Sequence, residues 1–273
     1  MKGKTGELLY FLLWFADRLA RPTFRNLTDS FEGWSYQNGL SLQLARLEKM
    51  KLVERNASNH SSRLYRLTEA GRIQALGGRD PVARWSRPWD GKWRLFLFDV
   101  PVVRNSHRDR LRYLLKNLCF GVLQGSVWIS PDPPGTELEI LKQGKTDVNS
   151  LLVLEARPGS GEKDAEIVAG AWDFEEIHSR YTNYLKLLDQ RPPGRIAGEA
   201  EARSFREWAE LERDSWREIV RTDPFLPRVL LPKDYLGCRA WRRRISVLRE
   251  AKQQLLTFIS NTDSNSIRRC EID

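Results

Sequence analysis

The stretch from Ser35 to Arg72 constrains the fold of this chain most, because a helical pattern is followed directly by a hairpin pattern. Leu40, Leu44 and Leu47 recur at i, i+4 and i+7, so they share one face of a helix. The opposite face is polar, basic and sterically open, with Asn38, Ala45, Arg46 and Lys49. The spacing therefore predicts a helix with one face in a core and the other open to a partner.

Two short β-type runs follow this helix, at residues 52–55 and 63–67, and the polar segment 56–62 separates them. Thr68 is placed to cap a last helix, with Gly71 close by. A winged helix-turn-helix has this order of elements, and it lays its second helix in the major groove of DNA and its wing along the backbone. Many helix–hairpin units contact only protein, so the pattern alone leaves DNA binding and protein binding open.

The distribution of charge favours DNA. Residues 1–88 hold 15 Lys and Arg against 8 Asp and Glu, a net of +7, whereas the whole chain carries +9. The remaining two thirds of the chain therefore add only +2. A basic module of this size attracts a phosphate backbone, and its affinity should fall steeply with salt.

Eight residues of this module are the candidate DNA contacts. We expect Tyr36, Asn38, Ser41, Arg46 and Lys49 in the major groove, and His60, Ser62 and Arg63 against the backbone from the wing. An arginine can make a bidentate contact to guanine and an asparagine to adenine, so Arg46 and Asn38 are the expected base readers.

A linker rich in glycine and proline follows, with Gly77, Gly78, Pro81 and Pro88. Its Trp85 and Trp89 are interpreted as anchors that hold the linker against the next domain. Strands are predicted at residues 93–100, 120–123, 126–130 and 149–156, with helices at 108–118 and from Glu137. This β-α-β-β-α-β order is that of a ferredoxin-like domain.

The last hundred residues read as helices, at residues 174–188, 199–220 and 240–260. The second of these is expected to bury Phe205, Trp208, Leu211, Trp216 and Ile219. We therefore predict an α+β multidomain protein: a winged helix at 1–76, a linker at 77–91, a ferredoxin-like central domain at 92–172 and a helical C-terminal domain at 173–273.

Three motifs carry a family resemblance: WDGKWRLFLFDVP, RDRLRYLLKNLCFGVLQGSVWISP and the C-terminal DPFLPRVLLPKDYLG. Together with the RLYRLTEAGR ending of the hairpin module, they resemble the PaaX family of bacterial repressors, in the same domain order over nearly the whole chain. Members usually have a glycine that ends the recognition helix, where this chain has Met50-Lys51. The resemblance implies a repressor of a catabolic operon, released by phenylacetyl-coenzyme A or another acyl-coenzyme A.

The central domain of that family is itself similar to small nucleases of CRISPR adaptation, in which an aspartate at the position of Asp99 binds a metal shared across a dimer. A lone carboxylate is a poor Mg²⁺ site, so the favoured role of Asp99 is a cap at the Pro101 turn or a pair with a nearby arginine, and a metal-dependent nuclease is the alternative. No catalytic triad, GxGxxG or P-loop occurs, so we expect neither an enzyme nor a cofactor.

Two features of the C-terminal region allow an effector site. Arg242, Arg243 and Arg244 can hold acyl-coenzyme A phosphates, although a solvated helix face is the favoured interpretation. The aromatic residues Tyr181, Tyr184, Phe205, Trp208 and Trp216 can line a ligand pocket, although such residues more often form core. The effector-binding residues therefore stay unassigned.

Composition limits the cross-links, the membrane segments and the cellular location that we expect. Cys119, Cys238 and Cys270 are scattered without CxxC spacing, which excludes a disulfide framework and suits the cytoplasm. No run reaches the roughly 20 apolar residues of a membrane helix. We expect a cytoplasmic homodimer that binds two half-sites of double-stranded DNA, with a pure interaction scaffold as a third interpretation.

Overall fold

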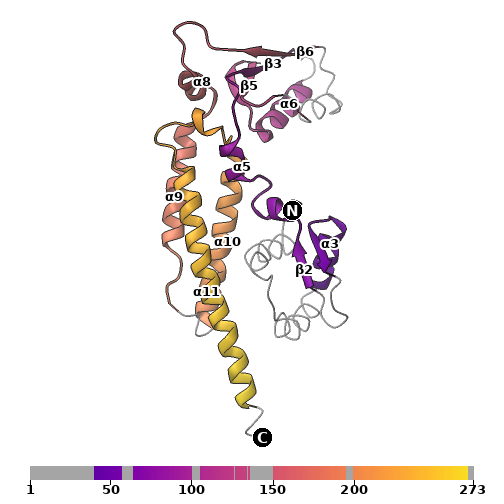
Figure 1. Ribbon diagram of the computed structural model, residues 1–273, viewed down its shortest axis with the longest axis vertical. Helices are drawn as coiled ribbons and strands as arrows, with labels where there is room; N and C mark the ends of the chain where they lie inside the picture. The colour runs from indigo at the N-terminus through magenta and orange to yellow at the C-terminus, as the bar shows by residue number, and fades with distance from the viewer. Residues whose placement is uncertain are drawn as a thin grey trace. The chain divides into compact units, whose positions relative to one another are not determined.

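This computed structural model describes residues 40–56, 64–99, 105–125, 127–133, 135, 150–194 and 199–269 (Figure 1). The chain forms two compact units, and neither is continuous in sequence. Unit 1 takes residues 1–80, 187–214 and 241–273, and unit 2 takes residues 81–186 and 215–240. Helices α10 (Glu199–Thr222) and α11 (Gly237–Arg269) contribute to both.

Unit 1 begins with the predicted order of helix, hairpin and capped helix. These elements are α3 (Leu40–Lys49), β1 (Val53–Asn56), β2 (Leu64–Leu67) and α4 (Glu69–Ala75). The two strands pair antiparallel, with Val53 opposite Leu67. The two helices that a winged helix places before α3, and the tip of the hairpin, lie outside the described residues.

A small apolar core holds these elements together. It consists of Leu44, Leu47, Leu52, Val53, Ala75 and Leu76, all buried. Leu67 and Trp241 pack against this cluster, and Trp241 comes from α11. The C-terminal helix therefore takes part in the same core as the hairpin module.

Unit 2 is built on a four-stranded antiparallel sheet. Its strands β3 (Trp93–Asp99), β4 (Gly121–Gln124), β5 (Val127–Ser130) and β6 (Ser150–Ala156) lie in the order β4-β5-β3-β6. Since β3 and β4 are both antiparallel to β5, they run parallel to each other, and α6 (Asn105–Asn117) connects them. This is the split β-α-β connection that the sequence predicts. The predicted helix from Glu137 lies outside the described residues.

The two faces of the sheet carry separate cores, because side chains alternate along each strand. Phe96 and Trp128, which are cross-strand partners, face α6 and pack with Leu111, Leu115 and Phe120. The other face carries Trp93 and Ile129, which pack with Val168, Ala171, Trp172, Leu226 and Leu230. The second core thus joins the sheet to the segment that follows α10.

A short helix that the sequence did not predict, α8 (Asp164–Ala171), covers the second face. It approaches β4 so closely that a Cβ added at Gly121 would lie 2.7 Å from Cβ of Ala171. Glycine is therefore required at this strand position. The helix has little amphipathic pattern of its own, and its contacts with the sheet hold it in place.

The expected linker also contains a helix, α5 (Pro81–Ser86), whose Trp85 is buried as an anchor would be. The indole Nε1 of Trp85 donates a hydrogen bond to the Tyr235 hydroxyl at 3.0 Å. The hydroxyls of Tyr181 and Tyr235 both donate to Asp223 Oδ2 at 2.6 Å, and Asp223 is fully buried. These bonds fasten α5 and α9 (Phe174–Asp189) to the segment after α10.

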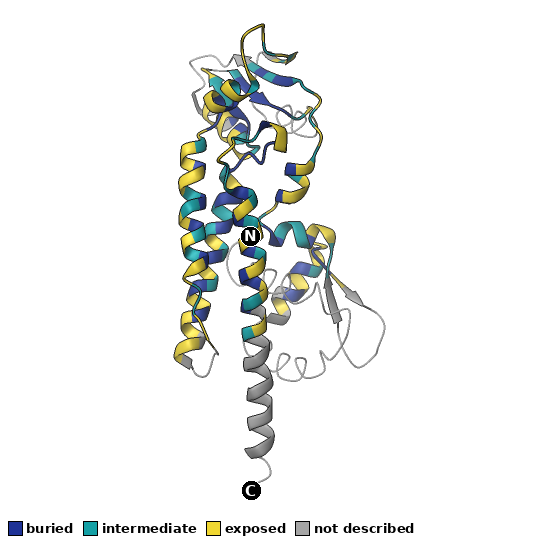
Figure 2. Ribbon diagram, turned by 60° about the vertical axis from the view of Figure 1, so that its left-hand side comes forward, coloured by how far each residue is buried: buried dark blue, intermediate teal, exposed yellow. Residues whose placement is uncertain are grey.

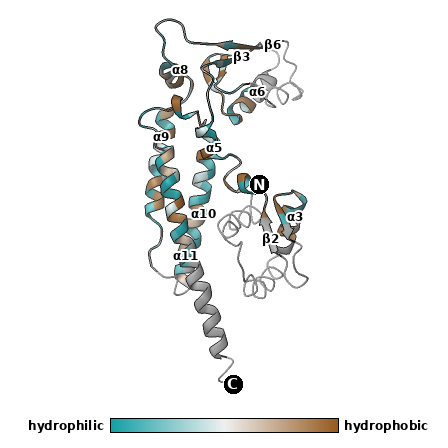
Figure 3. Cartoon of the chain, viewed as in Figure 1, coloured by the Kyte–Doolittle hydropathy of each residue, from teal (hydrophilic) through white to brown (hydrophobic). Residues whose placement is uncertain are grey.

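Helices α9 and α10 match their predicted ranges to within two residues, whereas α11 continues to Arg269, nine residues past its predicted end. Hydrophilic and hydrophobic residues alternate along α9 and α10 (Figure 3). One predicted core member is wrong: Leu211 is 60% exposed. The buried positions among the described side chains of α10 are Phe205, Trp208, Glu212, Trp216, Ile219 and Val220. Glu212 takes the core position because Arg244 of α11 pairs with it. Among the described residues, no helix is long and apolar enough to span a membrane.

Candidate nucleic-acid interface

Helix α3 is held by one face and presents the other. Leu44 and Leu47 are 8% and 0% exposed, whereas Ala45, Arg46 and Lys49 are exposed (Figure 2). Arg46 and Lys49 are three residues apart, so they lie on neighbouring turns of the same face. Neither forms an ion pair with any residue that the structure describes. The face is therefore positively charged and accessible.

The end of α3 is fixed by a Schellman motif. The amide of Lys51 donates to the carbonyl of Glu48, and the amide of Leu52 donates to the carbonyl of Leu47, both at 2.9 Å. Lys51 occupies the left-handed position of this motif with φ of 57°, a conformation that glycine adopts at the least cost. The helix ends here in the same way as a glycine-ended helix, at some cost in strain.

Helix α4 is clamped to this turn through Thr68 and Gly71. Thr68 Oγ1 donates to the carbonyl of Lys51 at 2.7 Å and accepts from the amide of Gly71 at 3.0 Å, which makes Thr68 the predicted N-cap. A Cβ at Gly71 would lie 1.8 Å from the carbonyl oxygen of Leu52. Only glycine allows α4 to pass this close, so these residues set the angle between the helix, the hairpin and α4.

The structure places only part of the predicted DNA contacts. Arg46 and Lys49 lie together on the open face of α3, and Ser41 lies in its first turn, where its side chain is not described. The other predicted contacts, Tyr36, Asn38, His60, Ser62 and Arg63, lie outside the described residues. The structure therefore shows two exposed cations on one face of α3, and a role in DNA binding stays a prediction for all eight residues.

Two exposed apolar residues on α3 and at its end were missed. Leu42 is 57% exposed and Met50 is 54% exposed. Leu42 lies two positions from Leu40 and Leu44, about 200° around the helix, so the helical period could have placed it on the open face. An isolated exposed apolar residue beside cations suits contact with a thymine methyl group.

The run Arg242–Arg244 is not a uniform charged face. Arg242 and Arg243 are exposed, and Arg243 pairs with Asp189 at 2.7 Å. Arg244 is fully buried; its Nε donates to Glu212 Oε1 at 2.8 Å, and its guanidinium lies 5.8 Å from the ring of Trp241. The predicted solvated face is wrong for Arg244, and so is a phosphate-binding role, because its charge already serves a buried pair.

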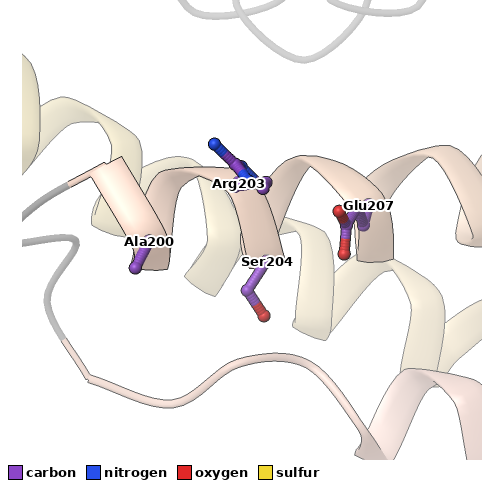
Figure 4. Close-up of a pocket in the computed structure, with 4 residues that line it drawn as sticks. All are labelled: Ala200, Arg203, Ser204 and Glu207. Carbon is purple, nitrogen blue, oxygen red and sulfur yellow. The ribbon is translucent and has the colours of Figure 1, made fainter.

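The C-terminal aromatic residues are core. Tyr181, Tyr184, Phe205, Trp208 and Trp216 are all buried, and Tyr184 and Trp216 stack at 5.5 Å between ring centroids. A hollow of about 420 Å³ lies instead at the start of α10 in unit 1, lined by Ala200, Arg203, Ser204 and Glu207 (Figure 4). All four come from one exposed stretch of helix, and three of the four are polar or charged.

The described residues add no support for the alternative metal site at Asp99. Asp99 is the last residue of β3, opposite Ser150 of β6, and its side chain is not described. Within the described residues, no group of three or more His, Cys, Asp or Glu side chains is placed to hold a metal ion.

Comparison with known proteins points to one family. Residues 86–168 match the PaaX protein central Cas2-like domain, and residues 172–259 match the PaaX-like protein C-terminal domain. The transcriptional repressor PaaX of Escherichia coli K12 is 23% identical in an alignment of 262 positions that covers 93% of this chain and 75% of that repressor. A relative that represses transcription does not favour the nuclease alternative.

A solved structure shares the fold. The uncharacterized protein Rv0674 from Mycobacterium tuberculosis superposes with a TM-score of 0.54 at 19% identity, over 91% of this chain and 96% of that one. At this identity the likeness concerns the fold alone. It extends over nearly the full length of both chains.

Proposed function

The chain belongs to the PaaX family, and from this membership we propose that it is a DNA-binding transcriptional repressor that acts in the cytoplasm by binding and not by catalysis. One observation carries the proposal. Helix α3 presents Arg46 and Lys49 to solvent while Leu44 and Leu47 hold it in the core of a helix, hairpin and capped helix. A recognition helix of a winged helix-turn-helix at residues 1–76 would be built in this way.

Base readout is assigned to the open face of α3. Arg46 reaches guanine through a bidentate contact, and Leu42 and Met50 supply apolar surface for thymine methyl groups. Asn38 reads adenine, and Tyr36 and Ser41 complete the groove contacts. Lys49 and the wing residues His60, Ser62 and Arg63 hold phosphates, which orients the module without reading sequence.

The test is selection of bound duplexes from a random pool, followed by affinity measurements on the selected site and on single-base variants. Arg46→Ala should cost about 1–3 kcal/mol at one base position and relax specificity there. Lys186→Ala is the matched control, because Lys186 is an exposed cation of α9 that forms no ion pair with a described residue. A uniform loss with Arg46→Ala on every sequence, random DNA included, would contradict the base-reading role.

We further propose a homodimer that binds two half-sites about one helical turn apart. The selection experiment tests this directly, because a two-fold symmetric protein selects a palindromic site with constant spacing. Single half-sites bound with equal affinity, together with a monomeric mass in solution, would contradict the dimer.

Release from DNA is assigned to a small effector of the acyl-coenzyme A class, phenylacetyl-coenzyme A being the one that family membership implies. The structure offers a path for such control within unit 1. Trp241 of α11 packs against the core that carries α3, and Arg244, one turn further along, pairs with Glu212 of α10. An effector that favours one arrangement of α10 and α11 can therefore change the population in which α3 binds DNA.

The effector is tested by repeating the gel-shift measurement with phenylacetyl-coenzyme A and with coenzyme A alone. Loss of the shifted band with the acyl form only is the expected result. Trp241→Ala should leave DNA binding but weaken its response to the effector, because the ring is the described contact from α11 to the core of α3. An unchanged band with every acyl-coenzyme A would reject this class of effector.

A further inference from the structure

Helix α6 of unit 2 has a fixed orientation on the sheet. It buries Leu111 and Leu115, each 1% exposed, against Phe96 and Trp128 of strands β3 and β5. Figure 1 shows the helix beside these strands. Because two buried leucines one turn apart determine which side of a helix faces the sheet, the opposite side of α6 is presented outward by the fold itself.

The outward side is charged and carries one aromatic residue. Asp109, Arg112, Tyr113 and Lys116 are exposed and recur at i, i+3, i+4 and i+7, which places them on one face. Tyr113 is 64% exposed and is the one aromatic residue among the large, exposed hydrophobic side chains of the described chain. We call Arg112, Tyr113 and Lys116 the α6 surface.

Within the described part of the chain, Arg112 and Lys116 of this helix have no carboxylate partner. Four of its 13 residues are Arg or Lys and one is acidic, and neither Arg112 nor Lys116 forms an ion pair with a residue that the structure describes. Other arginines of unit 2 do have carboxylate partners: Arg84, Arg87, Arg94, Arg180 and Arg221. The cations of the α6 surface are therefore available to an outside partner.

Helix stability accounts for Lys116 but not for Arg112. Lys116 in the last turn complements the helix dipole, whereas Arg112 lies in the middle of α6, where the dipole gives a cation little support. The first turn also contains no acidic residue, although one would stabilise the helix there. The helix dipole therefore does not explain the cation at Arg112.

The neighbouring end of α10 lies against the end of α6. Cys119 Sγ, just after α6, is 3.7 Å from the carbonyl oxygen of Arg221. The Arg221 guanidinium is exposed but bound by Glu218 at 2.7 Å, so it adds little net charge. Among the described residues, Asp109 and Glu218 are thus acids beside the surface, and Arg112 and Lys116 supply its cations.

From these observations we propose that the α6 surface binds the phosphate backbone of duplex DNA without reading its sequence, as a second contact apart from α3. Arginine, lysine and tyrosine are all donors to phosphate oxygens. A protein partner would need an apolar centre to its interface, but Leu111 and Leu115 of α6 are used in the core, and Tyr113 alone is a large exposed hydrophobic residue on the described part of this helix. The proposal goes beyond the operator contact and does not depend on which bases α3 reads.

The test uses the full chain and measures binding to a random-sequence 40-bp duplex over a range of salt concentrations. Each phosphate contact that is lost should lower the salt slope by about 0.9. The double variant Arg112→Gln/Lys116→Gln should therefore lower it by about 1–2 and weaken binding by roughly tenfold at moderate salt, equally on all sequences. Tyr113→Ala should weaken binding several-fold without a matching change in slope.

The control removes the same charge from the same unit. Lys186 and Arg157 are exposed and form no ion pair with a described residue, so Lys186→Gln/Arg157→Gln matches the α6 variant in net charge. Thermal unfolding should be unchanged in both variants, since all four side chains are exposed. If the α6 variant loses no more than the control, the proposal is overturned, and an acidic protein becomes the partner to test for this surface.

The result can be separated from the operator contact. Arg46→Ala changes base preference, whereas the α6 variant should leave base preference unchanged and lower affinity uniformly. If the α6 variant loses DNA binding and Arg46→Ala has no effect, the proposed recognition helix is contradicted and the α6 surface is supported. If only Arg46→Ala loses binding, the recognition helix is supported and the α6 surface is contradicted.

Discussion

Helices α3 and α11 both carry arginine in unit 1, and the structure uses that residue in opposite ways. On α3, Arg46 and Lys49 are exposed and form no ion pair with the described residues. On α11, Arg244 is completely buried and bound to a completely buried Glu212. An exposed cation costs the fold little and remains available to DNA, whereas a buried one must be paired before the chain can fold.

The difference teaches that burial, and not residue type, separates a binding residue from a scaffold residue. Arg242 and Arg243 have the same chemistry as Arg244 and adjoin it in sequence, yet both are exposed. Their neighbour faces inward because a helix turns by about 100° per residue. Loss of a buried, paired charge should therefore cost the most, and loss of an exposed one the least.

Arg244→Ala should give the largest effect. It leaves Glu212 buried without its cation, and breaking a buried pair costs about 3–5 kcal/mol of unfolding free energy. Chemical denaturation monitored by tryptophan fluorescence measures the loss. Arg243→Ala, one residue away, removes an exposed pair with Asp189 and should cost less than about 1 kcal/mol.

A double variant tests the buried pair more strictly. Arg244→Met combined with Glu212→Leu replaces both charges by apolar side chains and should recover most of the loss. If Arg244→Ala is no worse than Arg243→Ala, the buried pair does not hold α10 and α11 together, and the contrast between the two helices is wrong.

Gly71→Ala tests the scaffold of α3 without touching any cation. Its new Cβ would lie 1.8 Å from the carbonyl oxygen of Leu52, so the turn after α3 must shift. We expect a loss of about 1–3 kcal/mol in stability, as for other overpacked sites, and weaker DNA binding because α3 is displaced. Thr68→Ser keeps the cap and serves as the control. Full stability in Gly71→Ala would show that the close approach of α4 to this turn is not required for folding.

Lys51→Gly should act in the opposite direction. Lys51 is a cation whose backbone conformation matters to the fold, with φ of 57° at the end of α3. Glycine removes the strain of the left-handed backbone, roughly 1–2 kcal/mol, but it loses more conformational entropy on folding than lysine does. The unfolding free energy should therefore rise by up to about 1 kcal/mol. Cys119, with φ of 61° at the end of α6, offers the same test in unit 2. A loss of stability in both glycine variants would contradict the strain.

The smallest effect concerns an exposed partner of a buried arginine. The hydrogen bond from Arg94 lowers the pKa of Asp90 from 3.8 to about 2, and Asp90 itself is solvent-exposed. A carboxylate with a lowered pKa in the folded state stabilises the fold above its ordinary pKa. That contribution should be lost as the pH falls from about 3.8 to about 2, and Asp90→Asn should flatten the pH dependence of stability in this window. Identical curves of stability against pH for the wild type and Asp90→Asn would show that the pair of Asp90 with Arg94 does not contribute to stability.

Much of the fold could be predicted from sequence because it follows local periodicity. The spacing of Leu44 and Leu47, the cap at Thr68 and the order of the strands all appear as predicted. Helix α8 was missed because its contacts with β4, and no strong pattern of its own, hold it in place. Leu211 was wrongly placed in the core because the core position belongs to Glu212, which pairs with Arg244, 32 residues away in sequence.

The candidate site, like the fold, could be predicted from sequence only in part. Helical spacing was sufficient to put Arg46 and Lys49 on the open face of α3, because the leucines that oppose them are close in sequence. It could not show that Arg244 is withdrawn from solvent while Arg112 and Lys116 are presented to it. Those outcomes depend on which side of α11 meets α10 and which side of α6 meets the sheet.

The sequence by itself determined the family, the order of the strands and long helices, and the basic character of the amino-terminal third, since each is a property of neighbouring residues. Only the tertiary structure decided which charges are buried and which are exposed, because burial depends on segments that are distant along the chain.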